Sequence, residues 1–313
     1  MRVDLSPLRT ATPAEAARFF ADVDAEALVA AVAATSNDEL SAIVDRDEIR
    51  PVAVEGILAR LGEYAVPDRL AAMTGDVRID LERAGRVVER HGLSFSGGAI
   101  DLRSHVGADH EADVVLRSDA LRFVRLVSGG CNAALEYLAG TLDIAGSADL
   151  ALALGGMFRV PGSAEAVVDP TALDPVDVAT ALASASRKHL EGVMTSGFRP
   201  VVLGEIFRRL PDYVDPVAAR DTTLSVAFRL TGNPSGEVER YVVRLASGVA
   251  TVEPGESGEA RDATVTCQAH DFLRLATGHL SAVTGVLKGQ LKVRGDKAKA
   301  LRLSSVIDIP RPR

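Results

Sequence analysis

The sequence has no tryptophan, and aromatic residues make up only 4% of its 313 residues. This shortage argues against the stacking platforms that bind single-stranded nucleic acid. The two cysteines, Cys131 and Cys267, are too few for a disulfide framework or a tetrahedral zinc site. A formal net charge of −8 argues against broad attraction to polyanions. We therefore expect no nucleic-acid partner.

Long hydrophobic runs are missing as well. No stretch approaches the ~20 apolar residues that span a bilayer, and residues 1–20 carry acids and prolines where a secretory signal has an apolar run. Hydrophobic residues nevertheless make up 47% of the chain, which is enough for sizeable cores. These patterns predict a soluble, cytoplasmic protein without integral membrane association.

An internal repeat organises the chain. Residues 50–64 (RPVAVEGILARLGEY) resemble residues 199–213 (RPVVLGEIFRRLPDY), with seven identical pairs at an offset of 149. The same offset aligns residues 112–154 with residues 261–303 without a gap. A period of this length corresponds to a domain and not to a solenoid repeat. The sequence therefore predicts a tandem duplication.

The repeat also predicts where the domains begin and end. We expect a first domain over residues 14–159 and a second over residues 176–313. The stretch between them, residues 160–175, contains prolines and a glycine, which is typical of a linker.

Each half shows the same order of elements. In the second half, apolar residues at helical spacing predict helices over residues 175–193 and 200–210. Alternating apolar residues predict the strands that follow, over residues 224–230, 241–246 and 248–253. The whole order is helix, helix, four strands, helix, helix, strand, helix. It favours an α+β fold, in which a five-stranded, mainly antiparallel sheet is covered by helices in each domain.

The second half also carries a family resemblance. Its run DFLRLATGHLSAVTGVLKGQLKVRGDKAKALRL includes the segment GQLKVRGD at residues 289–296. Over residues 223–307 it resembles the sterol carrier protein type 2 (sterol-binding domain) family. The first half, with GTLDIAG at residues 140–146, resembles a degenerate copy of the same domain. The resemblance implies two sterol-carrier-like domains with an apolar tunnel for sterols, fatty acids or acyl-CoA, and no cofactor.

A tunnel of this kind needs mainly apolar walls. Alternation along the strands and helical spacing in the following helix predict the ligand-binding residues: His91, Leu93, Phe95, Phe123, Leu126, Leu224, Val226, Phe228, Tyr241, Val243, Leu245, Phe272 and Leu275. Apolar periodicity does not distinguish the wall of a cavity from a filled core, so core packing remains the alternative for each of them.

Motifs of catalysis are missing from the sequence. It contains no phosphate-binding glycine loop, no GxSxG and no HExxH, and its six histidines show no metal-ligand spacing. We predict no metal site and leave open whether the protein is an enzyme. If it is one, the candidate catalytic residues are His91, Tyr241 and Asp271. The thiol of Cys131, next to a helix start, is expected to be buried and inert.

The two halves differ most in their last helix. The second half has six bases in this region: Lys288, Lys292, Arg294, Lys297, Lys299 and Arg302. In the first half the aligned positions carry one acid and five apolar or small residues. These bases indicate a contact with acyl-CoA or with a ligand on an acidic carrier protein, unless they form a solvated face. The first-half segment, residues 148–158, is apolar nearly all round and predicts a buried helix.

Three functions fit these patterns. The first is a binding protein that holds a lipid, sterol, fatty-acyl or polyketide-like molecule in the tunnel. The second is a cyclase-like biosynthetic enzyme that folds a polyene or polyketide chain in the same tunnel. The third is a structural module with filled cavities. Oligomeric state is not indicated by the sequence.

Overall fold

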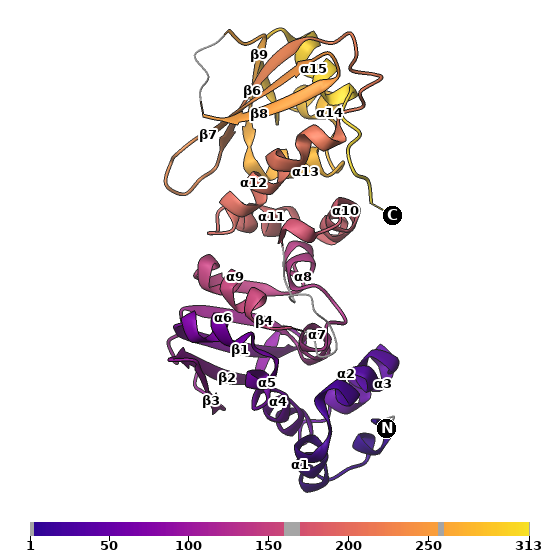
Figure 1. Cartoon of the computed structure of the whole chain (residues 1–313), viewed down its shortest axis with the longest axis vertical. Coiled ribbons are helices and arrows are strands. Elements are labelled where there is room, and N and C mark those ends of the chain that lie inside the picture. The colour runs from indigo at the N-terminus through magenta and orange to yellow at the C-terminus, as the bar shows by residue number, and fades with distance from the viewer. Residues whose placement is uncertain (1–2, 160–169, 256–259, 313) are drawn as a thin grey trace. The chain divides into compact units, whose positions relative to one another are not determined.

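The computed structural model describes residues 3–159, 170–255 and 260–312. The chain divides into two compact units, Met1–Tyr137 with Thr141–Asp169 and Pro170–Arg313 with Leu138–Gly140. Each unit contains one five-stranded sheet with helices, which confirms the predicted α+β class (Figure 1). Of the predicted linker, residues 160–169 lie outside the described residues.

Up to residue 159 the order from the first strand onward is the predicted one, but six α-helices and a 3-10 helix precede that strand where two helices were expected. The elements are η1 (Ser6–Arg9), α1 (Pro13–Asp22), α2 (Ala25–Ala34), α3 (Asn37–Val44), α4 (Arg50–Leu58), α5 (Leu61–Tyr64), α6 (Pro67–Ala72), β1 (Gly75–Arg83), β2 (Arg86–Ser96), β3 (Ala99–Ser104), β4 (Val114–Asp119), α7 (Ala120–Val127), α8 (Ala133–Ala139), β5 (Asp143–Gly146) and α9 (Ala148–Met157).

From residue 170 the same order of strands and later helices returns, with three α-helices before the sheet in place of six. The elements are η2 (Pro170–Ala172), α10 (Pro175–Ser184), α11 (Arg187–Val193), α12 (Arg199–Arg209), η3 (Leu210–Tyr213), β6 (Leu224–Thr231), β7 (Glu239–Ala246), β8 (Val249–Pro254), β9 (Ala263–Gln268), α13 (Ala269–Ala276), α14 (Ala282–Leu287), β10 (Lys292–Gly295) and α15 (Lys297–Ser305).

Both sheets have the same strand order. The first runs β3-β2-β1-β4-β5, and the second, read from its other edge, runs β8-β7-β6-β9-β10. The central pair is parallel in each sheet (β1 with β4, β6 with β9), and the other pairings are antiparallel. The last strand follows two helices, and it pairs at the edge next to the strand that precedes them. A hairpin cannot make that connection.

One predicted helix is wrong in its extent. The helix expected over residues 175–193 is two helices, α10 and α11, because the chain turns extended at Ala185. The Ser186 side chain accepts a hydrogen bond from the backbone N–H of His189 at 3.1 Å, so Ser186 is the N-cap of α11. Serine competes for backbone hydrogen bonds inside a helix and is favoured at its start. Apolar spacing alone does not register that break.

The predicted turn between β7 and β8 has the backbone of a tight hairpin. Ser247 and Gly248 have φ angles of 52° and 82°. Positive φ at both central residues matches the twist of the flanking strands, and glycine adopts it without steric cost. Gly97 and Gly98 make the equivalent turn between β2 and β3.

The apolar segment near the end of the first half packs within its own unit. In α9, Leu154 and Met157 are buried and belong to the hydrophobic core of the first unit, whereas Ala153 is exposed. The backbone carbonyl of Met157 accepts a hydrogen bond from the N–H of Val66 at 2.9 Å. The segment therefore helps to close the core beside α6.

An arginine–glutamate pair joins the helical layer to the second strand of each sheet. In the first unit Arg50 Nε, on α4, donates to Glu89 Oε2, on β2, at 3.0 Å. In the second unit Arg199, on α12, donates to both carboxylate oxygens of Glu239, on β7, at 2.7 and 2.6 Å. Arg50 aligns with Arg199 and Glu89 with Glu239 in the repeat, so identical residues make the same connection twice.

None of the individual helices in the described residues meets the length and composition of a membrane span. Helices α2 and α3 meet them only when counted together, and the two are bent by 119° relative to each other.

Breaking the pair in the first unit should cost much of that unit's stability. In Arg50→Met the buried Glu89 carboxylate loses its arginine and keeps only the contact with His91 Nε2, so we expect the free energy of unfolding to fall by about 3–5 kcal/mol. In Arg50→Met/Glu89→Leu no unpaired charge remains, and part of the loss should be recovered. Urea unfolding followed by circular dichroism measures both. A single variant as stable as the parent would contradict the assignment.

The pair in the second unit should determine the pH below which that unit unfolds in acid. Burial raises the pKa of Glu239, but hydrogen bonds and charge from Arg199 outweigh it and hold this pKa below its ordinary value of 4.5. A lowered carboxylate pKa gives stability that is present above about pH 4.5 and is lost as the pH falls through the folded value.

Arg199→Met should therefore move the onset of acid unfolding to higher pH. Asn233→Ala removes a single 2.9 Å hydrogen bond to Glu239 and should move it less. Thermal melts between neutral and acidic pH test both variants. An unchanged pH profile in Arg199→Met would argue against this role of Glu239.

A candidate apolar cavity in the second unit

The second unit contains a cavity of about 170 Å³ between its sheet and its helices. Only two charged side chains, Glu205 and Arg209, take part in its lining. The lining residues are Pro175, Val178, Glu205, Ile206, Arg209, Leu210, Tyr213, Phe228, Val265, Phe272, Leu275, Ala276, Thr277, Ala282, Val286, Leu291, Val293, Ala300, Leu301, Leu303, Ser304, Ile307, Ile309 and Pro310.

One row of cross-strand neighbours forms the sheet side of the cavity. Phe228 on β6 pairs with Val265 on β9, and Val265 pairs with Val293 on β10. Directly paired residues project from the same face of a sheet. The row therefore presents three apolar side chains to the helices.

The helical side comes mainly from α13, α14 and α15. On α13, Phe272, Leu275 and Ala276 are three and four residues apart, which places them on one face of the helix. On α14, Ala282 and Val286 have the same i, i+4 relation. Side-chain oxygens cap helices in both units. Asp119 is the N-cap of α7 in the first unit, and Ser281 is the N-cap of α14 in the second; each accepts a backbone hydrogen bond through a side-chain oxygen.

Four aromatic rings pack together beside this lining. The ring of Phe207, on α12, is stacked on Tyr241 at 3.7 Å and on Phe272 at 4.8 Å between centroids. Phe228 lies 5.4 Å from Phe272 in a tilted arrangement. Contacts of this kind add to the energy of burial and fix the relative position of α12, α13 and the sheet.

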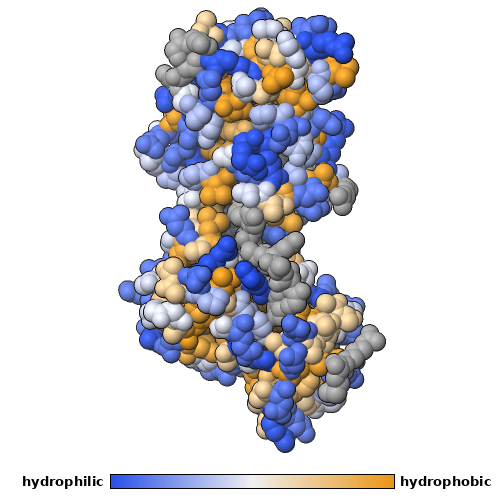
Figure 2. Space-filling model, viewed as in Figure 1, coloured by the Kyte–Doolittle hydropathy of each residue, from blue (hydrophilic) through white to orange (hydrophobic). Residues whose placement is uncertain are grey.

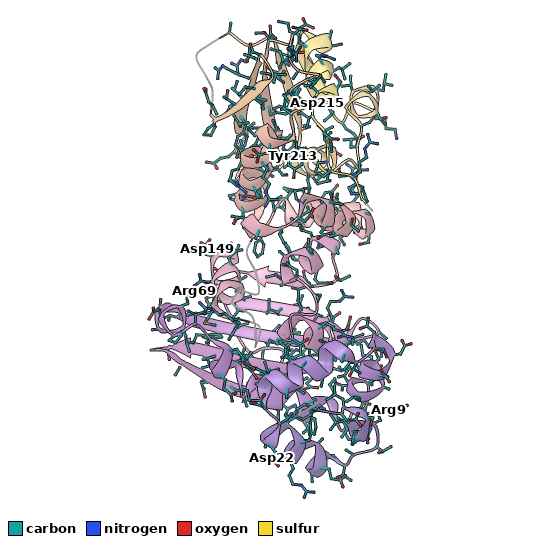
Figure 3. All side chains as sticks on the ribbon, turned by 45° about the vertical axis from the view of Figure 1, so that its right-hand side comes forward. Arg9, Asp22, Arg69, Asp149, Tyr213 and Asp215 are labelled. Carbon is teal, nitrogen blue, oxygen red and sulfur yellow. The ribbon has the colours of Figure 1, made fainter. Side chains whose placement is uncertain are left out.

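The segment after α15 closes one side of the cavity. The backbone N–H of Asp215 donates to the carbonyl of Val306 at 2.8 Å, and the N–H of Asp308 donates to that of Tyr213 at 2.7 Å. Figure 3 labels Tyr213 and Asp215, which lie on the stretch that holds this segment. Ile307 and Ile309 thereby become part of the lining.

The structure places the predicted second-half residues in two groups. Phe228, Phe272 and Leu275 line the cavity, and Tyr241 stacks beside them. The rest are fully buried on the same face of the sheet without being part of this lining: Leu224, Val226, Val243 and Leu245. Contact of these residues with a ligand stays a prediction.

The first-half residues belong to the core of the first unit. Leu93, Phe95 and Phe123 are buried in its main hydrophobic cluster, and Leu126 is half-buried on α7. Whether any of them contacts a ligand also stays a prediction.

Sequence reasoning missed several lining residues. Ile206, Val286, Leu291 and Val293 were not among the predicted ones, and neither was the aromatic Phe207 beside them. A signal was available, because Leu203 and Phe207 are four residues apart on a helix and both are buried. The residues after α15 had no such signal, since an irregular segment has no periodicity.

The three candidate catalytic residues are divided between the two units. His91 lies in the first unit and is fully buried, with Nε2 2.6 Å from Glu89 Oε1. Within the described residues its Nδ1 has no hydrogen-bond partner. In the second unit Asp271 is buried and accepts a hydrogen bond from Gln290 Nε2 at 2.8 Å, while burial raises the pKa of Tyr241. None of the three is part of the cavity lining.

His270 is another buried ionisable group of the second unit. Burial lowers the pKa of His270, which favours its neutral form, and its Nε2 lies 3.6 Å from carboxylate oxygens of Asp271 and of Glu191. In the part of the chain that the structure describes, no three His, Cys, Asp or Glu side chains are grouped as metal ligands.

Comparisons with known proteins match a different family model in each unit. Residues 54–159 match the model of the SCP-2 sterol transfer family, and residues 203–313 match that of the alkyl sulfatase C-terminal family. Hydroxysteroid dehydrogenase-like protein 2 of Xenopus tropicalis is 28% identical over 105 residues, which is 34% of this chain and 24% of that protein.

Sterol carrier protein 2 of Homo sapiens is 30% identical over 130 residues, which is 40% of this chain and 23% of that protein. The crystal structure of sterol carrier protein 2 like 2 from Aedes aegypti is 26% identical, with 35% of this chain and 95% of that chain covered and a TM-score of 0.29. The chain thus spans about a quarter of the length of these two curated relatives.

The family matches differ from the expectation about which half is the more typical sterol-carrier domain. The segment at residues 289–296 predicts the more specific sterol-carrier resemblance for the second half. The matching family model covers the first half, and the second half matches a different model. One short segment therefore does not decide which model fits a half best.

Both cysteines should be slow nucleophiles in the folded protein. Burial raises the pKa of Cys131 to about 11 and that of Cys267 to about 12. At pH 8 only about one Cys131 thiol in a thousand is then a reactive thiolate. We expect Ellman's reagent to label both slowly before, and rapidly after, unfolding in urea. Fast labelling of the folded protein that disappears in Cys131→Ser would contradict this.

Proposed function

We propose that the protein binds a hydrophobic small molecule, because residues 54–159 match the SCP-2 sterol transfer family, and that the cavity of the second unit holds its apolar part. The observation that carries the proposal is the cavity itself, whose walls are almost entirely apolar. Removing apolar ligand surface from water contributes roughly 25 cal/mol per Å², before the costs of association.

The size of the cavity favours a flexible chain over a rigid ring system. A cavity of about 150 Å³ accepts benzene in a well-studied protein core, and the one in this protein is of similar size at about 170 Å³. It takes part of an acyl or alkyl chain as it stands, whereas a four-ring sterol requires the walls to move. The name of the family that matches residues 203–313 also refers to an alkyl compound.

The two charged side chains in the lining, Glu205 and Arg209, already pair with each other. Arg209 Nε lies 2.5 Å from Glu205 Oε1, and its guanidinium also donates to the backbone carbonyls of Leu173 and Thr171. With these donors used, the cavity offers little to an anionic head group. We infer that the polar end, whether a free carboxylate, CoA or a carrier-protein arm, stays outside.

Several wall positions of the repeat carry a larger residue in the first half, although Phe228 aligns with the smaller Ile79 and Ser304 with Gly155. Ala276 aligns with Val127, Val286 with Tyr137, and Ile307 with Phe158. Larger side chains fill space that the second half leaves open. We infer that the halves arose by duplication and that the second kept the open cavity. The shared strand order and the shared arginine–glutamate pair support this inference.

The cyclase alternative has less support from the geometry. Catalysis in the cavity requires polar groups at its surface, and none of His91, Tyr241 and Asp271 is there. Binding needs only the apolar walls.

Filling the cavity tests the proposal. Val286→Tyr introduces the first-half residue, and Val249→Tyr is the matched control at an exposed position. Each methylene excluded from the cavity weakens binding about fourfold, so we expect affinity for cis-parinaric acid, read by its fluorescence, to fall more than tenfold in Val286→Tyr only. Melting temperatures check that both variants fold. Unchanged affinity in a folded Val286→Tyr would place the ligand elsewhere.

A further inference from the structure

The two sheets carry different charges on the face opposite their helices. On β1, Ile79 belongs to the core of the first unit, so its neighbour Asp80 projects from the other face of the sheet. Asp80 pairs with Arg90 on β2 and with Arg117 on β4. Arg117 in turn pairs with Asp143 on β5. Positive and negative residues therefore alternate along this row of cross-strand neighbours.

The acids of this first row neutralise its bases. Asp80 is only 1% exposed, and Arg78 Nε donates a hydrogen bond to its Oδ1 at 2.8 Å. The Nε atoms of Arg90 and Arg117 lie 3.7 and 3.4 Å from carboxylate oxygens of Asp80. Arg117 Nη1 also donates to Asp143 at 3.1 Å. One buried carboxylate thus holds three arginines together on this face.

The corresponding row of the second sheet contains no acid. Phe228 lines the cavity, so its neighbour Arg229 on β6 projects from the opposite face. Arg229 pairs with Arg240 on β7 and with Thr266 on β9. Thr266 in turn pairs with Lys292 on β10. This row, Arg240–Arg229–Thr266–Lys292, is called the basic row below.

The two acidic positions of the first row are the ones that differ in sign. Arg229 takes the position of Asp80, and Lys292 takes that of Asp143. Like charges on directly opposite residues of neighbouring strands destabilise a sheet. Arg229 and Arg240 are such a pair, so a negative charge from outside the row would stabilise it.

Arg229 lacks a counter-charge in the part of the chain that the structure describes. Its Nε atom is buried there without a hydrogen-bond partner, and its guanidinium forms no ion pair there. Two acids close to the ends of these strands pair with other bases. Glu253 lies 2.7 Å from Arg244, and Asp262 lies 2.6 Å from Lys299. A buried donor without an acceptor costs free energy, which a bound oxyanion would restore.

Bases on a protein surface are ordinarily solvated. Hydrophilic residues cover much of the visible surface of each unit (Figure 2). The basic row differs from scattered bases because strand pairing holds its members side by side, and because the other sheet places a buried carboxylate at the same position. The excess of acids in the chain lies in residues 1–159, so the second half as a whole does not repel an anion.

We propose that the basic row binds the phosphate group of a small phosphorylated molecule. Guanidinium groups donate paired hydrogen bonds to phosphate oxygens, and the hydroxyl of Thr266 supplies a further donor. A phosphate monoester carries about two negative charges at neutral pH, whereas a carboxylate carries one. The bound phosphate takes the place that the Asp80 carboxylate has in the first sheet.

The spacing of the strands suits one phosphate group. Neighbouring strands are about 4.8 Å apart, so the backbones at Arg229 and Lys292 are about 10 Å apart, with Thr266 between them. Both long side chains reach a phosphate that lies over Thr266. The site is on the other face of the sheet from the cavity, and it adds a second ligand to the function proposed above.

An acidic protein surface fits the basic row less well. Stable protein interfaces bury about 800 Å² on each side, and the centre of the interface is apolar. The apolar residues next to the row on the same face, Ala227 and Val242, are only 3% and 2% exposed. They offer a protein partner almost no apolar surface.

Calorimetric titration of the full chain tests the proposal. The probes are inorganic phosphate and glycerol phosphate, at an ionic strength held constant with chloride. Arg229→Asp introduces the first-half residue, whose carboxylate competes with the ligand for Arg240, so we expect the affinity to fall at least tenfold. Arg229→Lys keeps the charge without the paired donors and should lose less. Lys288→Asp, an equal charge reversal at an exposed position at the end of α14, should bind like the parent.

Thermal melts separate ligand binding from a purely structural role of Arg229. In phosphate-free buffer Arg229→Asp should melt at a higher temperature than the parent, because its carboxylate replaces a repulsive pair by an attractive one. Phosphate should raise the melting temperature of the parent and leave that of Arg229→Asp unchanged. The same melts show whether each variant is folded.

Three outcomes would overturn the phosphate site. The first is that neither phosphate compound binds to the parent. The second is equal binding by the parent and a folded Arg229→Asp, or an equal loss in Lys288→Asp. The third is tighter binding of a tetraglutamate peptide than of either phosphate compound, which would assign the basic row to an acidic protein partner.

Discussion

The arginine–glutamate pair, buried in the first unit and partly exposed at Glu239 in the second, is the contact on which the layered arrangement of each unit depends. It connects a helix that precedes the sheet with the second strand of that sheet, across about 40 residues of chain. A buried charge pair contributes little net stability as long as both partners are present. Its geometry is demanding, however, and it fixes which helix covers which strand. Everything that lines the cavity of the second unit is positioned on that framework.

The main features of the fold were accessible from the sequence because they follow periodicity. Alternation along β6 and β7, the turn at Ser247–Gly248 and the helical spacing in α13 all correspond to observed elements. The break between α10 and α11 could not be predicted from periodicity, because it depends on the single capping residue Ser186. The parallel pairing of β6 with β9 was also inaccessible, since it depends on a contact between distant segments.

The candidate site was only partly predictable for a different reason. Phe228, Phe272 and Leu275 were found because they share an apolar face, but so do Val226 and Val243, which pack in the core. Periodicity reports the face of an element and not the space in front of it. That space depends on the small residues opposite, such as Ala276, and on an irregular segment around Ile307.

The lining of the cavity begins at Pro175 and ends at Pro310, so it draws on both extremes of the second unit. No contiguous fragment of that unit can reproduce the whole enclosure. Closing it requires contacts between residues far apart along the polypeptide, and such long-range closure is slow compared with local helix formation. The apolar cavity therefore forms only when segments from both ends of this lining have come together, which makes its formation a late stage in the folding of the unit.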